Sequence, residues 1–188
     1  MENRENILNI ALMLFSSKGY DSVGIQEIVD KAGVTKPTLY HYFGSKRGLL
    51  DSLLEEHFNH LYEAVKTAAC YNGNLPETMS SVAKTVFEFA KSGKDFYRMY
   101  LTMCFASPGS EAFSAVYPYN EKLNLLLTDL FKAASKDHGN MRGRHTRYAF
   151  TFWGMLNNYI TLFLGNFIEL NEESAYQAVK QFSHGIYS

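Results

Sequence analysis

Apolar residues recur every three to four positions along most of the 188-residue chain, which is the spacing of one face of an α-helix. Near the N-terminus this spacing is kept by Ile7, Leu8, Ala11, Leu12 and Phe15. No segment alternates apolar and polar residues as a half-buried strand does. The pattern predicts an all-α protein of about nine helices.

Glycines and capping residues divide the N-terminal part of this pattern into short helices. Gly19, Gly33 and Gly44 are expected to end the first three, because glycine adopts a positive φ without steric cost. Thr35 is placed to cap the third helix, which has a proline in its first turn. Ser45 is placed to cap a fourth, long helix that runs to about residue 70.

The C-terminal part is punctuated in the same way. Asn74 is expected to cap a fifth helix, and a sixth runs from 95 to about 106. Ser107-Pro108 is expected to start the seventh, and Pro118 predicts a kink or break in it near Tyr117. A helix over 144–167 follows, which carries no charge from residue 148 onward, and Asn171 caps the last helix.

The second and third short helices, 25–32 and 36–43, are joined by a tight turn and form a helix-turn-helix pattern, whose second helix enters the DNA major groove. Leu39 and Phe43 are expected to face the core. The residues that then face outward are Lys36, Pro37, Thr38, Tyr40 and His41. Lysine can reach guanine, and threonine can contact the thymine methyl group.

Local charge agrees with a DNA-binding surface, although the net charge of the chain is only −1. Residues 31–47 carry four cations and no acid, whereas residues 48–63 carry four acids and no lysine or arginine. An ordinary surface helix pair is the alternative, but such a solvated surface usually mixes both signs.

The segment at 33–46 reads GVTKPTLYHYFGSK, and Phe15, Gly19-Tyr20 and the segment IQEIV at 25–29 precede it. Together these residues resemble the DNA-binding region of TetR/AcrR-family transcriptional regulators. The resemblance covers about residues 5–55; beyond residue 60 only length and helix layout agree. It implies a homodimeric repressor, with a helix-turn-helix domain at 1–47 and a helical ligand-binding and dimerisation domain at 48–188.

The resemblance also assigns roles to individual residues. The base-facing positions are Gln26, Lys36, Pro37, Thr38 and Tyr40, and the phosphate-facing positions are Thr35, His41, Tyr42 and Lys46. One position departs from the family pattern: Gly24 stands where a threonine or serine usually caps the second helix, so a side-chain phosphate contact is lost there.

Nine aromatic residues lie between 87 and 119, which suggests a largely apolar pocket for an apolar or aromatic small molecule. A plain aromatic core is the alternative. The expected ligand-binding residues are Phe89, Phe96, Tyr97, Tyr100, Met103, Phe113, Tyr117, Trp153 and Asn157.

The uncharged helix is apolar nearly all round, so we expect it to be buried against a second subunit. The last helix adds a further apolar face, and two helices from each protomer would form a four-helix interface about a two-fold axis. Such a dimer predicts a palindromic operator. The expected interface residues are Phe152, Leu156, Tyr159, Phe163, Val179, Phe182 and Ile186.

Composition and motifs exclude or disfavour several other classes of protein. The apolar share of 46% excludes disorder, and the two cysteines form no C-x-x-C motif, which disfavours a disulfide scaffold or a zinc knuckle. The N-terminus lacks the features of a secretory signal, so we expect a cytoplasmic protein. The uncharged stretch 148–168 is long enough to cross a membrane, but its three asparagines disfavour that alternative.

No catalytic fingerprint is present, so we expect no enzyme and no cofactor. A metal site at Glu56, His57 and His60 is conceivable but lacks a further ligand. The rival interpretation is a small-molecule-binding or enzymatic helical protein whose helix-turn-helix is incidental. A DNA mobility shift at two salt concentrations separates the two interpretations.

Overall fold

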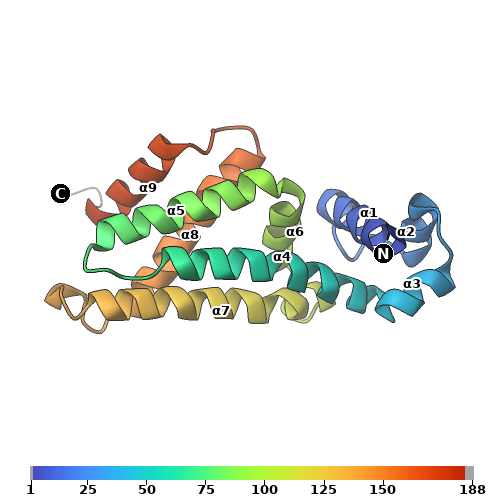
Figure 1. Ribbon diagram of the computed structural model, residues 1–188, viewed down its shortest axis with the longest axis horizontal. Helices are drawn as coiled ribbons and strands as arrows, with labels where there is room; N and C mark the ends of the chain where they lie inside the picture. The colour runs from blue at the N-terminus through green and yellow to red at the C-terminus, as the bar shows by residue number, and fades with distance from the viewer. Residues whose placement is uncertain (1, 185–188) are drawn as a thin grey trace. The chain divides into compact units, whose positions relative to one another are not determined.

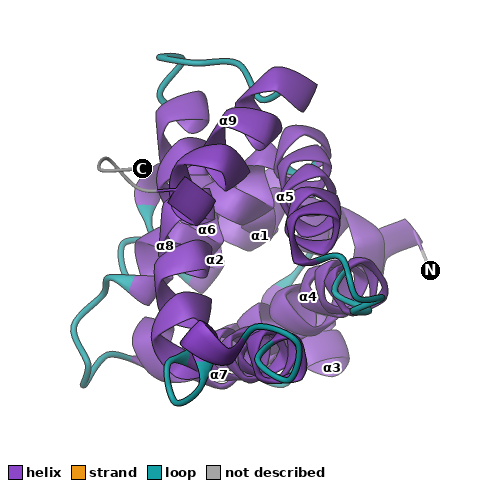
Figure 2. Ribbon diagram, turned by 90° about the vertical axis from the view of Figure 1, so that its left-hand side faces the viewer, coloured by secondary structure: helices purple, strands orange, loops and turns teal. Residues whose placement is uncertain are grey.

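The computed structural model describes residues 2–184, and within them it contains helices and no strand (Figures 1 and 2). The predicted all-α class is therefore confirmed. The helices are α1 (Glu2–Lys18), α2 (Ile25–Ala32), α3 (Lys36–Phe43), α4 (Lys46–Ala68), α5 (Leu75–Ser92), α6 (Lys94–Cys104), α7 (Glu111–Ala134), the short 3₁₀ helix η1 (Gly139–Met141), α8 (His145–Leu164) and α9 (Glu172–His184).

The chain divides into two compact units. Unit 1 comprises the residues up to Asn59 together with Lys94–Tyr119, and unit 2 comprises His60–Gly93 and the chain from Asn120 onward. Helices α4 and α7 each contribute residues to both units. The predicted DNA-binding domain, residues 1–47, falls inside unit 1, but a domain boundary after residue 47 stays a prediction.

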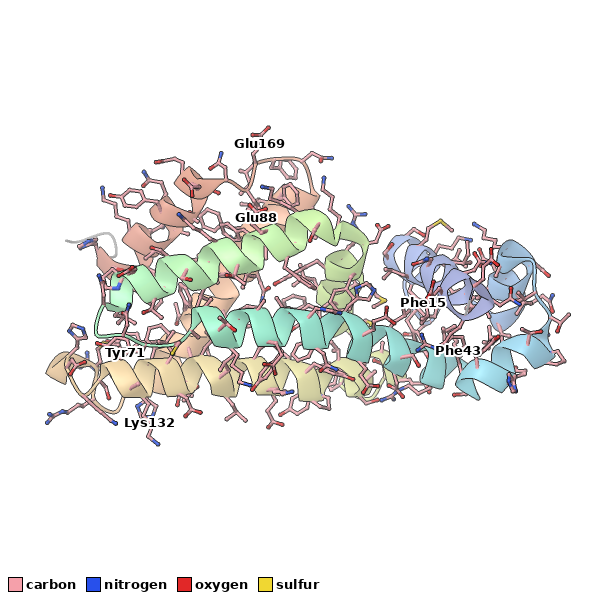
Figure 3. The ribbon with its side chains drawn as sticks, in the orientation of Figure 1. Phe15, Phe43, Tyr71, Glu88, Lys132 and Glu169 are labelled. Atoms are coloured by element: carbon pink, nitrogen blue, oxygen red, sulfur yellow. The ribbon has the colours of Figure 1, made fainter. Side chains whose placement is uncertain are left out.

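Unit 1 is built around α1, which packs against α2, α3 and α6. Phe15 of α1 and Phe43 at the end of α3 are buried in this unit and are labelled in Figure 3. The side chains of Ile7, Ile28 and Leu39 are fully buried beside them in the core. Removing these apolar surfaces from water supplies the main stabilisation of such a short helical unit.

In unit 2, α5 packs against α8 and α9, and α8 packs against α9. Four aromatic rings from α7, α8 and α9 form one cluster: Phe131, Tyr148, Phe152 and Phe182, with neighbouring ring centroids 5.2–6.4 Å apart. Such tilted and edge-to-face pairs add attraction beyond the area that they bury. Through this cluster the end of α9 packs against α7 and α8.

The helix ends follow the predicted local signals. Gly33 and Gly44 end α2 and α3 with φ of +66° and +71°. Ser45 accepts a hydrogen bond from the Gly48 N–H at 2.9 Å, and Asn74 accepts one from the Glu77 N–H at 3.2 Å. These caps satisfy backbone donors that the helices leave unpaired.

The prediction for the seventh helix is wrong in two respects. The helix begins at Glu111 rather than at Ser107, with the hydroxyl of Ser110 accepting a hydrogen bond from the Phe113 N–H at 3.1 Å. It is also not broken near Tyr117, because Pro118 lies inside the continuous α7; a kink at that position stays a prediction. Proline removes one helical hydrogen bond, and Pro118 is exposed, where water can replace the lost partner.

Candidate nucleic-acid interface

The helix-turn-helix of unit 1 is held together by α2 and α3, which pack against each other and against α1. Gly24 caps α2 without a side-chain hydrogen bond, as its sequence predicted. Thr35 caps α3, with its hydroxyl accepting a hydrogen bond from the Thr38 N–H at 3.4 Å. Leu39 is fully buried and Phe43 is nearly so, which confirms that this face of α3 is the inner one.

The opposite face of α3 is open to solvent. Tyr40 is 46% exposed, Lys36 and Pro37 are exposed, and Thr38 is half-buried. The rings of the exposed His41 and Tyr42 lie 5.3 Å apart, edge to face. The surface of α3 therefore offers a cation, hydroxyls and aromatic rings of the kind that read base edges and hold phosphates.

Some polar groups of this surface have partners in the chain itself. The amide of Gln26 donates to the Asp30 carboxylate at 2.7 Å, and the hydroxyl oxygens of Thr35 and Thr38 lie 2.9 Å apart. Lys36 has no salt bridge with another of the described residues. Its ammonium is therefore available to a ligand, whereas Gln26 has to exchange its partner before it can reach a base.

The two cations at the start of α4 are less accessible. The Lys46 ammonium lies 4.1 Å from the centre of the Tyr20 ring, and burial lowers the pKa of Lys46. The Arg47 guanidinium donates to Asp51 at 2.8 Å and to the Ser114 hydroxyl at 3.1 Å. The hydrogen bond to Asp51 raises the pKa of Arg47. Of the four cations predicted in this segment, Arg47 is thus paired within unit 1.

Sequence reasoning missed the two residues whose contact supports the start of α4, Tyr20 and Glu111. The buried Tyr20 donates a 2.5 Å hydrogen bond to the carboxylate of Glu111, which follows it by 91 residues. Burial raises the pKa of Tyr20 above its usual range, and the bond to Glu111 raises it further. No local pattern signals a pair so far apart in the chain.

The residues predicted to bind a small molecule fall into both units. In unit 1, Tyr97 and Tyr100 are fully buried with ring centroids 5.8 Å apart, and Phe96 and Met103 are buried in the same helix. Phe113 and Tyr117 lie one turn apart on α7, the first half-buried and the second exposed, with ring centroids 5.7 Å apart. Their role as ligand contacts stays a prediction.

In unit 2, Phe89 and Asn157 are half-buried, and Trp153 is 4% exposed. The indole N–H of Trp153 is buried without a hydrogen-bond partner among the described residues. A buried donor of this kind costs free energy unless a partner is supplied, so it requires an explanation.

Unit 2 also has two cavities that the sequence did not predict. One has a volume of about 470 Å³ and lies between α8 and α9, with Arg147, Met155 and Gln181 among its lining residues. The other, of about 240 Å³, is lined by residues of α5, α7, α8 and α9 and by His138 and Met141. Tyr148 and Phe182 line both cavities, and none of the nine predicted ligand residues lines either one.

Residues 7–53 match the sequence model of the bacterial regulatory proteins of the tetR family. This segment of the chain matches the TetR family. The matched residues contain most of α1, all of α2 and α3, and the start of α4, so the match rests on the helix-turn-helix described above. A TetR-family protein is a DNA-binding regulator of transcription, which confirms the function class predicted from the sequence.

Full-length relatives extend the comparison beyond this segment. The transcriptional activator FasR of Mycolicibacterium smegmatis is 26% identical over 98% of this chain and 82% of its own. The transcriptional repressor KstR2 of Rhodococcus jostii is 23% identical over 79% of this chain and 73% of its own. Both relatives are transcriptional regulators of the helix-turn-helix type.

A solved structure shows the same fold. The transcriptional regulator FadR from Bacillus subtilis, in complex with stearoyl-CoA, superposes with a TM-score of 0.79 at 17% identity, over 97% of this chain and 99% of the other. The fold of that regulator is thus shared over 97% of this chain, not only over the helix-turn-helix.

The predicted dimer interface stays a prediction, and its residues differ in their exposure on the single chain. Phe152, Leu156 and Val179 are already buried within unit 2 by their own chain. Phe182 is half-buried in the aromatic cluster, and Tyr159 stacks on Phe87 with ring centroids 5.9 Å apart. Phe163 is half-buried, and Ile186 lies outside the described residues.

The exposed face of α8 and α9 carries different side chains from those expected. Phe150, Leu162 and Tyr176 are 55%, 37% and 52% exposed, and Gly154 lies between the first two on α8. Periodicity showed that α8 is apolar on more than one face but could not show which face its own chain covers.

Two alternatives from the sequence, a membrane span and a metal site, can be tested on the residues that the structure describes. None of the helices within residues 2–184 has the combined length and hydropathy that a membrane span requires. Across that same range, no three histidine, cysteine, aspartate or glutamate side chains are grouped to hold a metal ion, and the candidate trio around His57 is not such a group. The His57 ring instead stacks on Phe96 with ring centroids 4.7 Å apart.

Proposed function

We propose that this protein is a homodimeric TetR-family repressor that acts in the cytoplasm, binds a palindromic operator through α3 and is released by a small-molecule effector. The observation that carries the proposal is the arrangement of α3. Lys36 and Tyr40 are exposed on one face of this helix, while Leu39 is buried in the core of unit 1. Within this proposal Gln26, Lys36, Pro37, Thr38 and Tyr40 face bases.

The remaining residues of the interface face phosphates in this proposal. They are Thr35, His41, Tyr42 and Lys46. Phosphate contacts fix the register of the protein on the duplex, and base contacts supply sequence specificity. Operator binding should therefore be both sequence-specific and steeply dependent on salt concentration.

The effector is proposed to have an apolar body and a hydrogen-bond acceptor. In unit 2, the half-buried Phe89 supplies apolar surface, and the unpartnered indole N–H of Trp153 supplies a donor. In unit 1, the aromatic residues of α6 and the start of α7 offer a separate apolar surface. The stearoyl-CoA bound to the B. subtilis FadR supports a ligand with a long apolar chain. We therefore favour acyl compounds as the first class to test.

Release follows if the effector binds the DNA-free conformation more tightly than the DNA-bound one, because a ligand shifts an equilibrium only by that difference. Helices α4 and α7 contribute residues to both units, so a tilt of α4 is the proposed route from the effector to α3. In a dimer, such a tilt changes the distance between the two recognition helices.

A mobility shift with the DNA upstream of the gene tests the first half of the proposal. Specific binding at about 0.05 M salt that weakens by orders of magnitude at about 0.2 M is expected for a protein with several phosphate contacts. Absence of specific binding would instead favour a small-molecule-binding or enzymatic protein with an incidental helix-turn-helix.

The effector can be tested directly, because Trp153 is the only tryptophan of the chain. Titration with acyl compounds of increasing length should change the intrinsic fluorescence and release operator DNA over the same concentration range. Trp153→Phe removes the unpartnered N–H and should weaken effector binding without lowering the thermal stability. A variant that responds like the wild type would remove Trp153 from the site.

A further inference from the structure

The Tyr20 side chain is fixed at both ends in unit 1. Its hydroxyl donates a 2.5 Å hydrogen bond to the Glu111 carboxylate in the first turn of α7. Its ring meets the edge of Phe15 with ring centroids 5.1 Å apart, and only 3% of the residue is exposed. The orientation of this ring is therefore set by a residue from another part of the chain.

The ring of Tyr20 in turn supports Lys46, the first residue of α4. The Lys46 ammonium lies 4.1 Å from the ring centroid, within the range of a cation–π interaction. Burial lowers the pKa of Lys46, and the carboxylates of Asp21 and Glu111 oppose that shift. The long lysine side chain is thus held in one place rather than left free in solvent.

The next residue joins the same two helices a second time. Arg47 donates to the Ser114 hydroxyl at 3.1 Å and to the Glu111 carbonyl oxygen at 3.5 Å. The start of α4 is consequently connected to the first turn of α7 both directly and through Tyr20. These contacts all lie within unit 1.

We propose that Glu111 is a positioning residue for DNA binding: by holding the Tyr20 ring, it places the Lys46 ammonium where it contacts a DNA phosphate. The inference rests on the proposed function, in which Lys46 faces a phosphate. Glu111 itself does not contact DNA. Its contribution is to reduce the conformational freedom that Lys46 loses on binding.

The same link gives the effector a route to Lys46. Phe113 and Tyr117, two of the proposed effector residues, lie on the same two turns of α7 as Glu111 and Ser114. An effector that displaces these turns removes the support of the Tyr20 ring. Operator affinity then falls without any direct contact between effector and DNA.

Two conservative variants separate the hydrogen bond of Glu111 from its charge. Glu111→Gln keeps an acceptor oxygen at the same reach and removes the charge. Glu111→Asp keeps the charge but is one methylene shorter, so its carboxylate does not reach the Tyr20 hydroxyl. Glu111 is exposed, and both variants are expected to fold; thermal unfolding checks this.

The experiment measures operator affinity by fluorescence anisotropy over a series of salt concentrations. Lys46→Ala should lower the slope of log affinity against log salt by about 0.9 for each protomer, which corresponds to about eightfold weaker binding per protomer at 0.1 M salt. Glu111→Asp and Tyr20→Phe should approach these values, whereas Glu111→Gln should bind like the wild type. The double variant Lys46→Ala/Glu111→Asp should be no weaker than Lys46→Ala alone.

Other outcomes overturn the inference. If Glu111→Asp leaves the slope unchanged, or if its effect adds fully to that of Lys46→Ala, Glu111 does not act through Lys46. Tighter binding by both Glu111 variants would mean that the carboxylate repels DNA or withholds Lys46 from it. If the wild type itself shows no specific, salt-dependent binding, the proposed function fails instead, so the two failures are distinguishable.

Discussion

The hydroxyl of Thr35 accepts a hydrogen bond from the backbone N–H of Thr38 at 3.4 Å, and the two hydroxyl oxygens lie 2.9 Å apart. The residue that caps α3 therefore also stabilises its first turn. Because α3 is only eight residues long, its ends contribute a large share of its local stability. The first turn is also where Lys36 and Thr38 would meet DNA.

Replacing this cap should destabilise unit 1. Thr35→Ala removes the acceptor and should lower the free energy of unfolding by about 1 kcal/mol, measured by urea denaturation followed by circular dichroism. Thr35→Ser keeps the hydroxyl and is the matched control, expected to be close to the wild type. Equal losses in both variants would show that the methyl group, not the cap, matters.

Lys36 is predicted to distinguish operator from unrelated DNA. Lys36→Ala should weaken operator binding by about 1–3 kcal/mol, because a base contact is lost, and should leave binding to unrelated DNA nearly unchanged. Lys31→Ala, at an exposed position in the last turn of α2, is the matched charge control. If both variants weaken both kinds of DNA equally, Lys36 acts only through its charge.

Two glycines at the ends of α2 should respond in opposite directions. Gly33 has a φ of +66°, so Gly33→Ala should cost about 1 kcal/mol of unfolding free energy even though its Cβ meets open space. Gly24 has an extended φ of −93°, and Gly24→Ser should add a few tenths of a kcal/mol by supplying a cap.

The Gly24 variant also tests the departure from the family pattern. If a serine at this position restores a phosphate contact, operator affinity and its salt dependence should both increase. An increase in stability without a change in affinity would mean that Gly24 affects only α2. Urea denaturation of Gly33→Ala and Gly24→Ser measures the change in stability, and fluorescence anisotropy of the same variants measures the change in operator affinity.

Local signals predicted the fold well because helix ends are decided by nearby residues. Gly33, Thr35 and Asn171 act within their own turns; the Asn171 side chain, for example, accepts from the Ser174 N–H at 2.9 Å. The helix-turn-helix was predictable for the same reason, since the buried residues Leu39 and Phe43 and the exposed residues all lie within the eight residues of α3.

Relationships between distant residues were not predictable. Tyr20 and Glu111 carry no sequence pattern that reveals their hydrogen bond. The start of α7 at Glu111 depends on the Ser110 cap, whereas the sequence pattern favoured Ser107-Pro108. The apolar faces of α8 look alike in sequence, and only packing shows that Phe152 belongs to the core of unit 2. Tertiary contacts therefore decided the pairing of Tyr20 and the buried face of α8, whereas a local cap decided the start of α7.

The two cysteines should differ in reactivity. Cys70 is exposed, whereas burial raises the pKa of the half-buried Cys104 to about 11. Only the thiolate reacts, so at pH 8 the thiolate fraction of Cys104 is roughly two-hundredfold smaller than that of a free cysteine. A thiol-specific chromogenic reagent should therefore show one fast and one slow thiol.

The pH dependence provides the check on this assignment. The slow reaction should accelerate as the pH rises toward 11, because the raised pKa keeps the thiol protonated below it. Cys70→Ser should retain only the slow phase, and both thiols should react quickly in denaturant. A fast reaction at pH 8 in folded Cys70→Ser would contradict the burial of Cys104.

The exposed face of α8 offers a test of the proposed dimer. Gly154 lies on this face, and a Cβ added there meets nothing within 4 Å apart from its chain neighbours and the local backbone of α8. Gly154→Lys should therefore leave the folded chain intact, or stabilise α8 slightly since glycine is a poor helix former. Across a two-fold interface the same substitution would bring two charges together, because each protomer contributes the same surface.

Sedimentation velocity at micromolar concentration should then show a dimer for the wild type and a monomer for Gly154→Lys. Ser81→Lys, at an exposed position on α5, is the matched control and should remain a dimer. The monomeric variant should also lose most of its operator affinity, because two half-sites are then bound independently. A dimeric Gly154→Lys would move the interface away from this face of α8, and a monomeric wild type would exclude the dimer at these concentrations.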